Sequence, residues 1–191
     1  KAQDMQLMEK EKMMKQIVEM LPLVQEQFFR EFLLGNYPNE EHIRNRLDFL
    51  KIPMEDGGHI CVMAIKINDF DANAPEINVA DSYLVSYSLK NIISSFSSKK
   101  QKIFPVQISG GEFAAIYFHT GGMDVKEDMI NTAVETINEV NARLNRNITI
   151  GISKGSREFV ELPLLYKQSL KALNTRFYNN NPMILFEDIE D

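Results

Sequence analysis

The residues best placed for chemistry surround a pair of glycines near the middle of the chain. Residues 109–111 read Ser-Gly-Gly and lie between two apolar runs, residues 103–108 and 112–118. Glycine adopts the positive φ values that a tight connection between strands requires, so this pattern predicts a β-hairpin. Glu112 follows the glycines and is the one acidic residue of this segment. By local chemistry alone, the segment is a hairpin.

Other side chains that often carry chemistry lack the spacing that such chemistry requires. His42, His59 and His119 have no metal-ligand spacing, and no serine lies in a nucleophile-elbow or triad pattern. His119 ends a predicted strand, where a hydrogen-bonded or solvated role is expected. Cys61 is the only cysteine and lies in a Val/Ile/Met run, so it is expected to be a small core residue. We therefore predict no catalytic residue, no metal site and no cofactor.

Composition limits the classes of partner. The 191 residues are 44% hydrophobic, enough for a core of one domain plus an appendage. The formal net charge of -6 argues against binding nucleic acid through its phosphates. No apolar run reaches the length of a membrane span, and the first residues are charged rather than signal-like. We expect a cytoplasmic fragment of a longer protein that does not itself insert into a membrane.

Residues 36–191 are predicted to form one α+β domain. The segment 60–67 is almost continuously apolar, which is typical of a central strand buried on both faces. Asn39 is predicted to cap a short helix that ends near Leu50. The expected order is β-α-β-β-α-β-α-β, a mostly antiparallel central sheet with flanking helices. The remaining elements are predicted as helices at 79–96, 124–144 and 162–178, the two hairpin strands, and strands at 148–153 and 183–186.

Residues 1–35 are predicted to form a long helical arm that acts as a coiled-coil connector. Apolar residues at alternating spacings of three and four indicate a dimer seam, which is interrupted by Lys10. Pro22 lacks an N–H and crowds the preceding turn, so a kink or a new helix is expected there. For residues 28–34, packing on the chain's own body remains an equal alternative. The predicted seam comprises Leu7, Met14, Ile17, Leu21, Val24 and Phe28.

The string SGGEFAAIYF resembles the signature hairpin of the GGDEF family of diguanylate cyclases, and the order of elements resembles that of GGDEF and class III nucleotide cyclase domains. With Glu112 aligned to the family's glutamate, Gly111 stands where the family has a metal-binding acid. The family's Asp-x-Asp-x-Phe pattern matches residues 66–70, with Lys66 and Asn68 at the two acidic positions. The resemblance thus implies a degenerate domain that is not an enzyme. A register shift that uses Asp69 or Asp71 is a disfavoured alternative, because neighbouring residues on a strand face opposite sides.

The family also carries a phosphate-binding lysine after the fourth strand. Its segment matches residues 172–177, which places Phe177 at the lysine position with Arg176 beside it. What remains of the substrate cleft could still bind a ligand without turnover. The residues that we assign to this candidate cleft are Ser109, Gly110, Gly111 and Arg176.

A narrower resemblance covers almost the whole chain. Residues 21–35, 46–50, 169–173 and 176–178 resemble AraC-type bacterial transcription regulators that contain a degenerate GGDEF-like module. This resemblance implies a non-catalytic signal-transmitting and dimerisation module between an upstream sensor or receiver and a C-terminal DNA-binding domain outside this chain. The expected partner is a second copy, and DNA is contacted only by that other domain. The alternative is a nucleotide-binding receptor domain or a residual diguanylate cyclase.

Overall fold

The computed structural model describes residues 1–37, 39–52, 57–68, 79–178 and 180–189. Five α-helices, five strands and three short 3₁₀ helices occupy these ranges. The helices are α1 (Ala2–Leu33), α2 (Glu40–Phe49), α3 (Val79–Ser95), α4 (Val125–Leu144) and α5 (Leu162–Asn174). The strands are β1 (His59–Ile67), β2 (Gln101–Ser109), β3 (Glu112–His119), β4 (Ile148–Ile152) and β5 (Met183–Leu185). The 3₁₀ helices are η1 (Phe159–Glu161), η2 (Thr175–Phe177) and η3 (Phe186–Asp188).

The strands form one sheet in the order β2-β3-β1-β4-β5. All neighbours are antiparallel except β4 and β5, which run parallel. This arrangement confirms the predicted α+β class and the predicted order of elements. The central strand β1 is almost entirely buried, as its continuous apolar sequence indicates.

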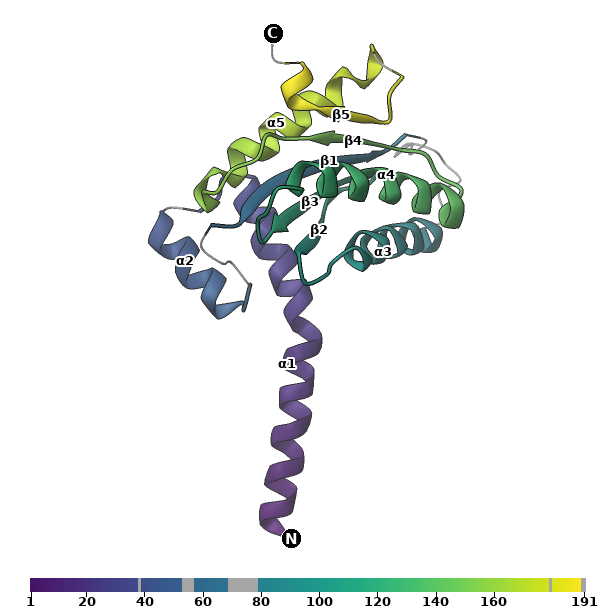
Figure 1. Ribbon diagram of the computed structural model, residues 1–191. Helices are drawn as coiled ribbons and strands as arrows, with labels where there is room; N and C mark the ends of the chain where they lie inside the picture. The colour runs from purple at the N-terminus through teal and green to yellow at the C-terminus, as the bar shows by residue number, and fades with distance from the viewer. Residues whose placement is uncertain (38, 53–56, 69–78, 179, 190–191) are drawn as a thin grey trace.

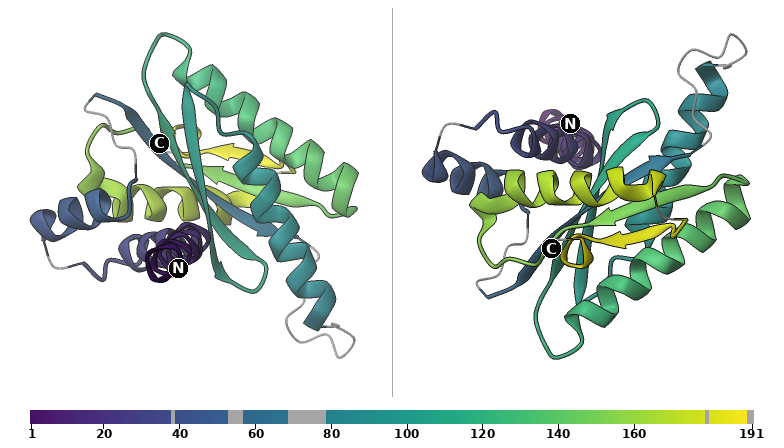
Figure 2. Two further views of the ribbon diagram at one scale, coloured as in Figure 1. Left: turned by 90° about the horizontal axis from the view of Figure 1, so that it is seen from below. Right: turned by 90° about the horizontal axis from the view of Figure 1, so that it is seen from above.

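Helices cover both faces of the sheet. The base of α1, together with α2 and α5, packs on one face, while α3 and α4 pack on the other (Figures 1 and 2). Alternate residues of β1 serve the two cores, with Ile60 and Val62 on the first face and Cys61 and Met63 on the second. Gly151 allows α5 to approach β4 closely, because a Cβ there would lie 2.3 Å from the Ser169 carbonyl oxygen.

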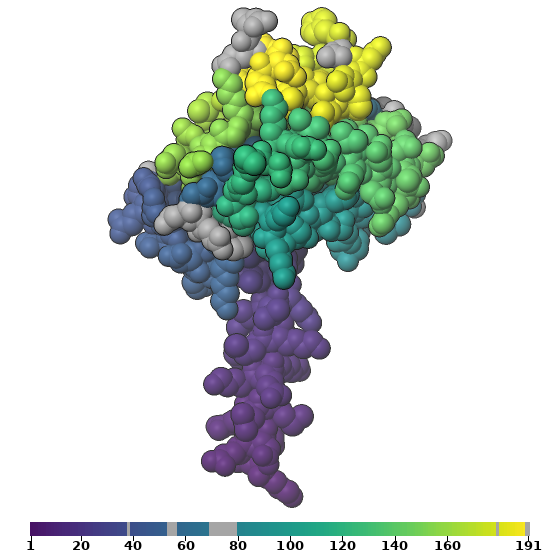
Figure 3. Space-filling view, in the orientation of Figure 1, coloured from purple at the N-terminus to yellow at the C-terminus, as the bar shows by residue number. Residues whose placement is uncertain are grey.

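The first helix is continuous from Ala2 to Leu33, so the predicted start of a new helix near Pro22 is wrong. Pro22 is exposed, and the carbonyl that its missing N–H leaves without a partner can be hydrated, which explains why the helix tolerates it. Most of α1 stands clear of the body (Figures 1 and 3). None of the helices in the described ranges is both long and apolar enough to span a bilayer.

The last two turns of α1 belong to the core. Phe28 is only 3% exposed, and its ring lies 5.3 Å from that of Phe29 and 5.0 Å from that of Tyr37. Assigning Phe28 to a seam between two chains therefore needs correction, because residues of its own chain bury it. Leu21 is also partly buried against this core. In contrast, Leu7, Met14 and Ile17 are 57–58% exposed.

Candidate functional site

The antiparallel register of β1 and β3 places Lys66 directly opposite Glu112. The Lys66 ammonium lies 3.2 Å from Glu112 Oε1, and the Ser109 hydroxyl donates to Glu112 Oε2 at the same distance. The carbonyl oxygen of Gly111 accepts a hydrogen bond from the Ile67 N–H. Four predicted site residues therefore meet at the hairpin end of the sheet, where the Glu112 carboxylate is shared between an ammonium and a hydroxyl group.

Asn68 lies on the adjoining edge of the sheet, just beyond β1. Its side-chain oxygen accepts a hydrogen bond of 2.9 Å from the Thr149 hydroxyl, and its N–H donates to the Asn147 carbonyl. These bonds orient Asn68 beside β4 rather than toward the hairpin. Asp69 and Asp71, the alternative acidic residues, lie outside the described residues.

Arg176 and the hairpin glycines lie apart in the described part of the structure. Arg176 lies on η2, where its guanidinium stacks 4.2 Å from the centre of the Phe177 ring. With Lys66 and Asn68 it lines a hollow of about 370 Å³, and residues 109–111 are not among the described residues that line this hollow. The predicted cleft therefore divides into a hairpin part and an Arg176 part, with Lys66 contributing to both.

Asparagines extend this hollow, and the sequence interpretation missed them. A neighbouring hollow of about 500 Å³ shares Asn68, Asn180 and Pro182 with the first. Asn138 and Asn141 of α4 and Asn147 complete its polar lining. The only local signal was the density of asparagines near residues 145–147 and 179–181, which by itself is typical of loops. The two hollows together offer amide donors and acceptors flanked by two cations.

The nearby helix α5 adds a tyrosine to the hairpin end. Tyr166 is largely buried, and this burial raises the pKa of its hydroxyl above its ordinary value, with the Glu112 carboxylate adding to the rise. Tyr166 therefore stays protonated at neutral pH. Among the described residues, no three His, Cys, Asp or Glu side chains are grouped so that they could hold a metal ion.

A second group of charges links α1 to the hairpin. The Glu26 carboxylate, only 12% exposed, lies 3.0 Å from Lys90 Nζ and 3.1 Å from Arg30 Nη2. It also accepts the backbone N–H of Gln107, while Arg30 Nε donates to the Gln107 carbonyl at 2.7 Å. Gln107 borders the bulge that precedes the hairpin, and β2 is an edge strand. We call Glu26, Arg30, Lys90 and Gln107 the α1 latch.

In the latch, two α1 side chains hydrogen-bond both backbone groups of Gln107 on the edge strand: Glu26 accepts from its N–H, and Arg30 donates to its carbonyl. The Gln107 side chain extends the connection, because its amide donates to the Ser86 hydroxyl and to the Gly110 carbonyl. Direct hydrogen bonds through Gln107 therefore connect α1 with the hairpin. One local signal of the latch is visible in the sequence, an i,i+4 Glu–Arg pair next to the apolar residues at the base of the helix.

His119 has the hydrogen-bonded role that was predicted. It is 2% exposed, and its Nδ1 accepts the Gly121 N–H at 3.0 Å. The ring proton must therefore be on Nε2, which lies 2.8 Å from Asp128 Oδ2. This pair ties the end of β3 to the first turn of α4.

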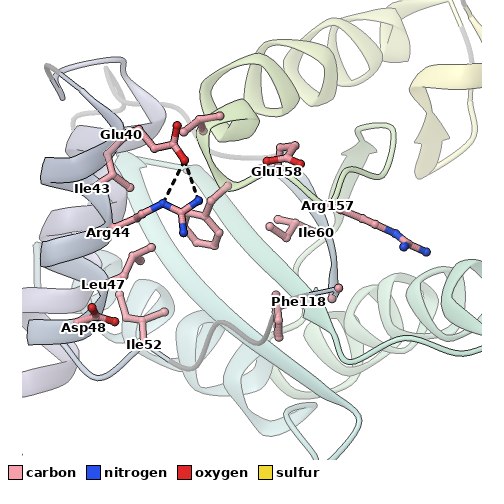
Figure 4. Close-up of a pocket in the computed structure, with 14 residues that line it drawn as sticks. Glu40, Ile43, Arg44, Leu47, Asp48, Ile52, Ile60, Phe118, Arg157 and Glu158 are labelled. Atoms are coloured by element: carbon pink, nitrogen blue, oxygen red, sulfur yellow. Dashed lines mark hydrogen bonds and ion pairs between the residues drawn. The ribbon is translucent and has the colours of Figure 1, made fainter.

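A further cavity of about 480 Å³ lies between α2 and the start of β1 (Figure 4). Ile43, Leu47 and Phe118 contribute apolar walls, and the Glu40–Arg44 ion pair lies at its rim. Charged residues share this lining with the apolar walls: Glu40, Arg44, Asp48, Arg157 and Glu158.

The fold that carries these features is that of the GGDEF diguanylate cyclase domains. No family model matches the sequence, and no curated protein matches it. The GGDEF domain of DgcB from Caulobacter crescentus, solved in complex with c-di-GMP, is similar with a TM-score of 0.54 and 17% identity over 81% of this chain and 94% of that chain.

Two other solved structures share this fold. The active GGEEF domain of a diguanylate cyclase from Vibrio cholerae has a TM-score of 0.53 and 15% identity over 76% of this chain and 90% of that one. The diguanylate cyclase SiaD from Pseudomonas aeruginosa, solved in complex with its activator SiaC, has a TM-score of 0.52 and 12% identity over 96% of this chain and 78% of that one. At these identities the likeness defines the fold.

Proposed function

We propose that this chain is a non-catalytic, signal-transmitting and dimerising module of a cytoplasmic AraC-type transcription regulator. In this proposal it joins an upstream sensor or receiver to a DNA-binding domain that lies outside the chain. The observation that carries the non-catalytic part is the Lys66–Glu112 ion pair at the hairpin. Lys66 occupies the position that the family resemblance gives to a metal-binding aspartate.

Electrostatics support this interpretation. A divalent ion at the hairpin would have to displace the Lys66 ammonium from Glu112 and then remain next to it. Like charges at such a distance repel, and Gly111 supplies no side-chain ligand to compensate. The arrangement therefore disfavours the two-ion chemistry on which transfer from a triphosphate depends.

The transmitting role is supported by the α1 latch. Two hydrogen bonds, from Gln107 N–H to Glu26 and from Arg30 to the Gln107 carbonyl, connect α1 to the strand that enters the hairpin. Lys90 of α3 pairs with the same Glu26 carboxylate. A helix that is rotated or drawn outward by a neighbouring domain would transfer that motion to Gln107. The exposed residues Leu7, Met14 and Ile17 give the same helix an apolar stripe for a second copy.

Incubation with GTP and either Mg²⁺ or Mn²⁺ tests the non-catalytic proposal. We expect no cyclic di-GMP above a heat-killed control in a mass-spectrometric assay. The double variant Lys66→Asp with Gly111→Asp is expected to regain weak metal binding at most. Turnover by the unmodified protein would contradict the proposal and would favour a residual cyclase.

The alternative, a nucleotide receptor, is favoured by the hollow that Lys66, Arg176 and several asparagines line. Cationic side chains form ion pairs with phosphate groups, and side-chain amides form hydrogen bonds with the edge of a nucleotide base. Titration calorimetry with GTP and cyclic di-GMP separates the two functions, since the transmitting module is expected to give no heat of binding. If binding occurs, Arg176→Ala should weaken it by about tenfold, or about 1.4 kcal/mol. Arg157→Ala, an exposed arginine beside another cavity, is the matched control.

A further inference from the structure

A cavity at the other end of β1 brings together side chains that favour soft metals. It has a volume of about 310 Å³ and lies where β1 begins, β3 ends and α4 begins. His59, Cys61 and Met129 are among its lining residues. Its location separates it from the hairpin and from the latch, because residue 59 pairs with residue 119 while residue 66 pairs with residue 112.

Two sulfur atoms are in contact in this cavity. Cys61 Sγ lies 3.1 Å from Met129 Sδ, so the thiol proton is directed at the thioether. Cys61 is 2% exposed, and burial raises the pKa of its thiol above the ordinary value, which keeps the metal-free thiol protonated and unreactive. The chain's only cysteine thus shares the cavity with a second, thioether sulfur.

His59 supplies a third ligand type. It lies two residues before Cys61 on β1, so both side chains project from the same face of the strand, with their backbones about 7 Å apart. Within the described part of the chain, the His59 imidazole makes no hydrogen bond or ion pair. It is half-buried, whereas the His119 ring is hydrogen-bonded to Asp128.

We propose that His59, Cys61 and Met129 form a binding site for a single copper(I) ion. Thiolate and thioether are the ligands that copper(I) selects, and imidazole also suits it. The ion replaces the thiol proton, so that Cu⁺ and the thiol give a Cu–S bond and one released H⁺ with no change of oxidation state. The resulting copper–thiolate pair is neutral.

Neutrality decides which ion fits the cavity. Lys126, Lys154 and Glu187 are also in its wall, so more cations than anions surround the ligands and added positive charge is opposed there. Zn²⁺ on one thiolate would leave a full positive charge there, and zinc sites usually have four ligands in a tetrahedral arrangement. Copper(I), with one charge and fewer ligands, matches what the cavity offers.

The test is anaerobic titration of the intact chain with copper(I) against the chelator bicinchoninate. We expect one ion per chain at the high-affinity step, release of one proton, and sulfur with nitrogen in the X-ray absorption spectrum of the bound ion. Cys61→Ala should abolish this step. Met129→Leu and His59→Gln should each weaken it by about tenfold. Zn²⁺ should not displace the copper.

Met63→Leu is the matched control, because Met63 is a buried methionine two residues along the same face of β1 and outside the cavity lining. It should leave copper(I) affinity unchanged. His59→Gln changes a half-buried residue and keeps the test decisive if Cys61→Ala does not fold. Equal copper(I) affinity in Cys61→Ala or His59→Gln and in the unmodified chain would overturn the proposal, because the exposed methionines of α1 would then account for binding. Failure to compete with the chelator, or preference for Zn²⁺, would also overturn it.

Discussion

At the scale of single residues, the Glu26 carboxylate contacts residues of three elements, α1, α3 and β2. One carboxylate receives an ammonium, a guanidinium and a backbone N–H, and it does so at 12% exposure. Removing the negative charge of Glu26 should destabilise the fold, because its partly buried cationic partners would then lack a charged acceptor. The geometry makes Glu26 the point at which helix and sheet are joined.

Replacing Glu26 with glutamine should therefore lower the free energy of unfolding. We expect a loss of about 1.5–3 kcal/mol, the range for hydrogen bonds to charged groups. Urea denaturation followed by circular dichroism measures it. Glu139→Gln is the control, since Glu139 pairs with Arg143 on an exposed face of α4 and should cost about 0.5 kcal/mol or less. Equal effects at both positions would rule out the latch as a stabilising contact.

At the scale of secondary-structure elements, α1 consists of two functionally distinct parts. Its base is aromatic and is buried by α2, α5 and the sheet. Its outer turns carry an exposed apolar stripe, and Figure 3 shows these turns standing clear of the body. The candidate seam between two chains therefore lies N-terminal to Phe28, with Leu7, Met14 and Ile17 as its most exposed members.

Lysines at Met14 and Ile17 should dissociate a dimer built on this seam. Like charges would face each other across the interface, while the body keeps its own core. Light scattering at micromolar concentration is expected to give a dimer for the unmodified chain and a monomer for the double variant. Ala2→Lys with Gln16→Lys adds the same charge away from the stripe and should remain dimeric. A monomeric unmodified chain at high concentration would contradict the seam.

At the scale of the whole molecule, buried hydroxyl and thiol groups connect stability to alkaline pH. Burial raises the pKa of Tyr117 above its ordinary value of 10.0, and the neighbouring Cys61 and Asp128 add to the rise. The Tyr117 hydroxyl donates to Gln101, which also contacts Thr132 of α4. The folded state therefore retains a proton that the unfolded chain loses.

The sign of the pH effect follows from this difference. Below pH 10 both states are protonated, and the contribution of Tyr117 is complete; above pH 10 only the unfolded state ionises, so stability falls. Tyr117→Phe should reduce this decline by up to about 1.4 kcal/mol per pH unit. Chemical denaturation between pH 8 and about pH 11 measures the slope. Tyr178→Phe, at a 94% exposed position, should leave it unchanged, and an unchanged slope in Tyr117→Phe would refute the account.

The sequence by itself determined the elements and their order. Local patterns predict local structure at three places: the apolar run of β1, the glycine hairpin between β2 and β3, and the Asn39 cap of α2. The Asn39 side chain accepts a hydrogen bond from the His42 N–H, as a cap requires. The family resemblance, rather than local patterns, grouped the hairpin residues with the end of β1. Local reasoning failed at Pro22, where the helix continues at an exposed position.

Only the tertiary structure decided what the functional side chains meet. Lys66 and Glu112 are 46 residues apart, Cys61 and Met129 are 68 apart, and Glu26 and Gln107 are 81 apart. No periodicity or spacing connects such pairs, because strand order and helix docking set their distances. The division of the predicted cleft has the same cause. Arg176 and the hairpin come from different edges of the fold, and the packing of α5 and η2 on the sheet brings Arg176 into the hollow that Lys66 also lines.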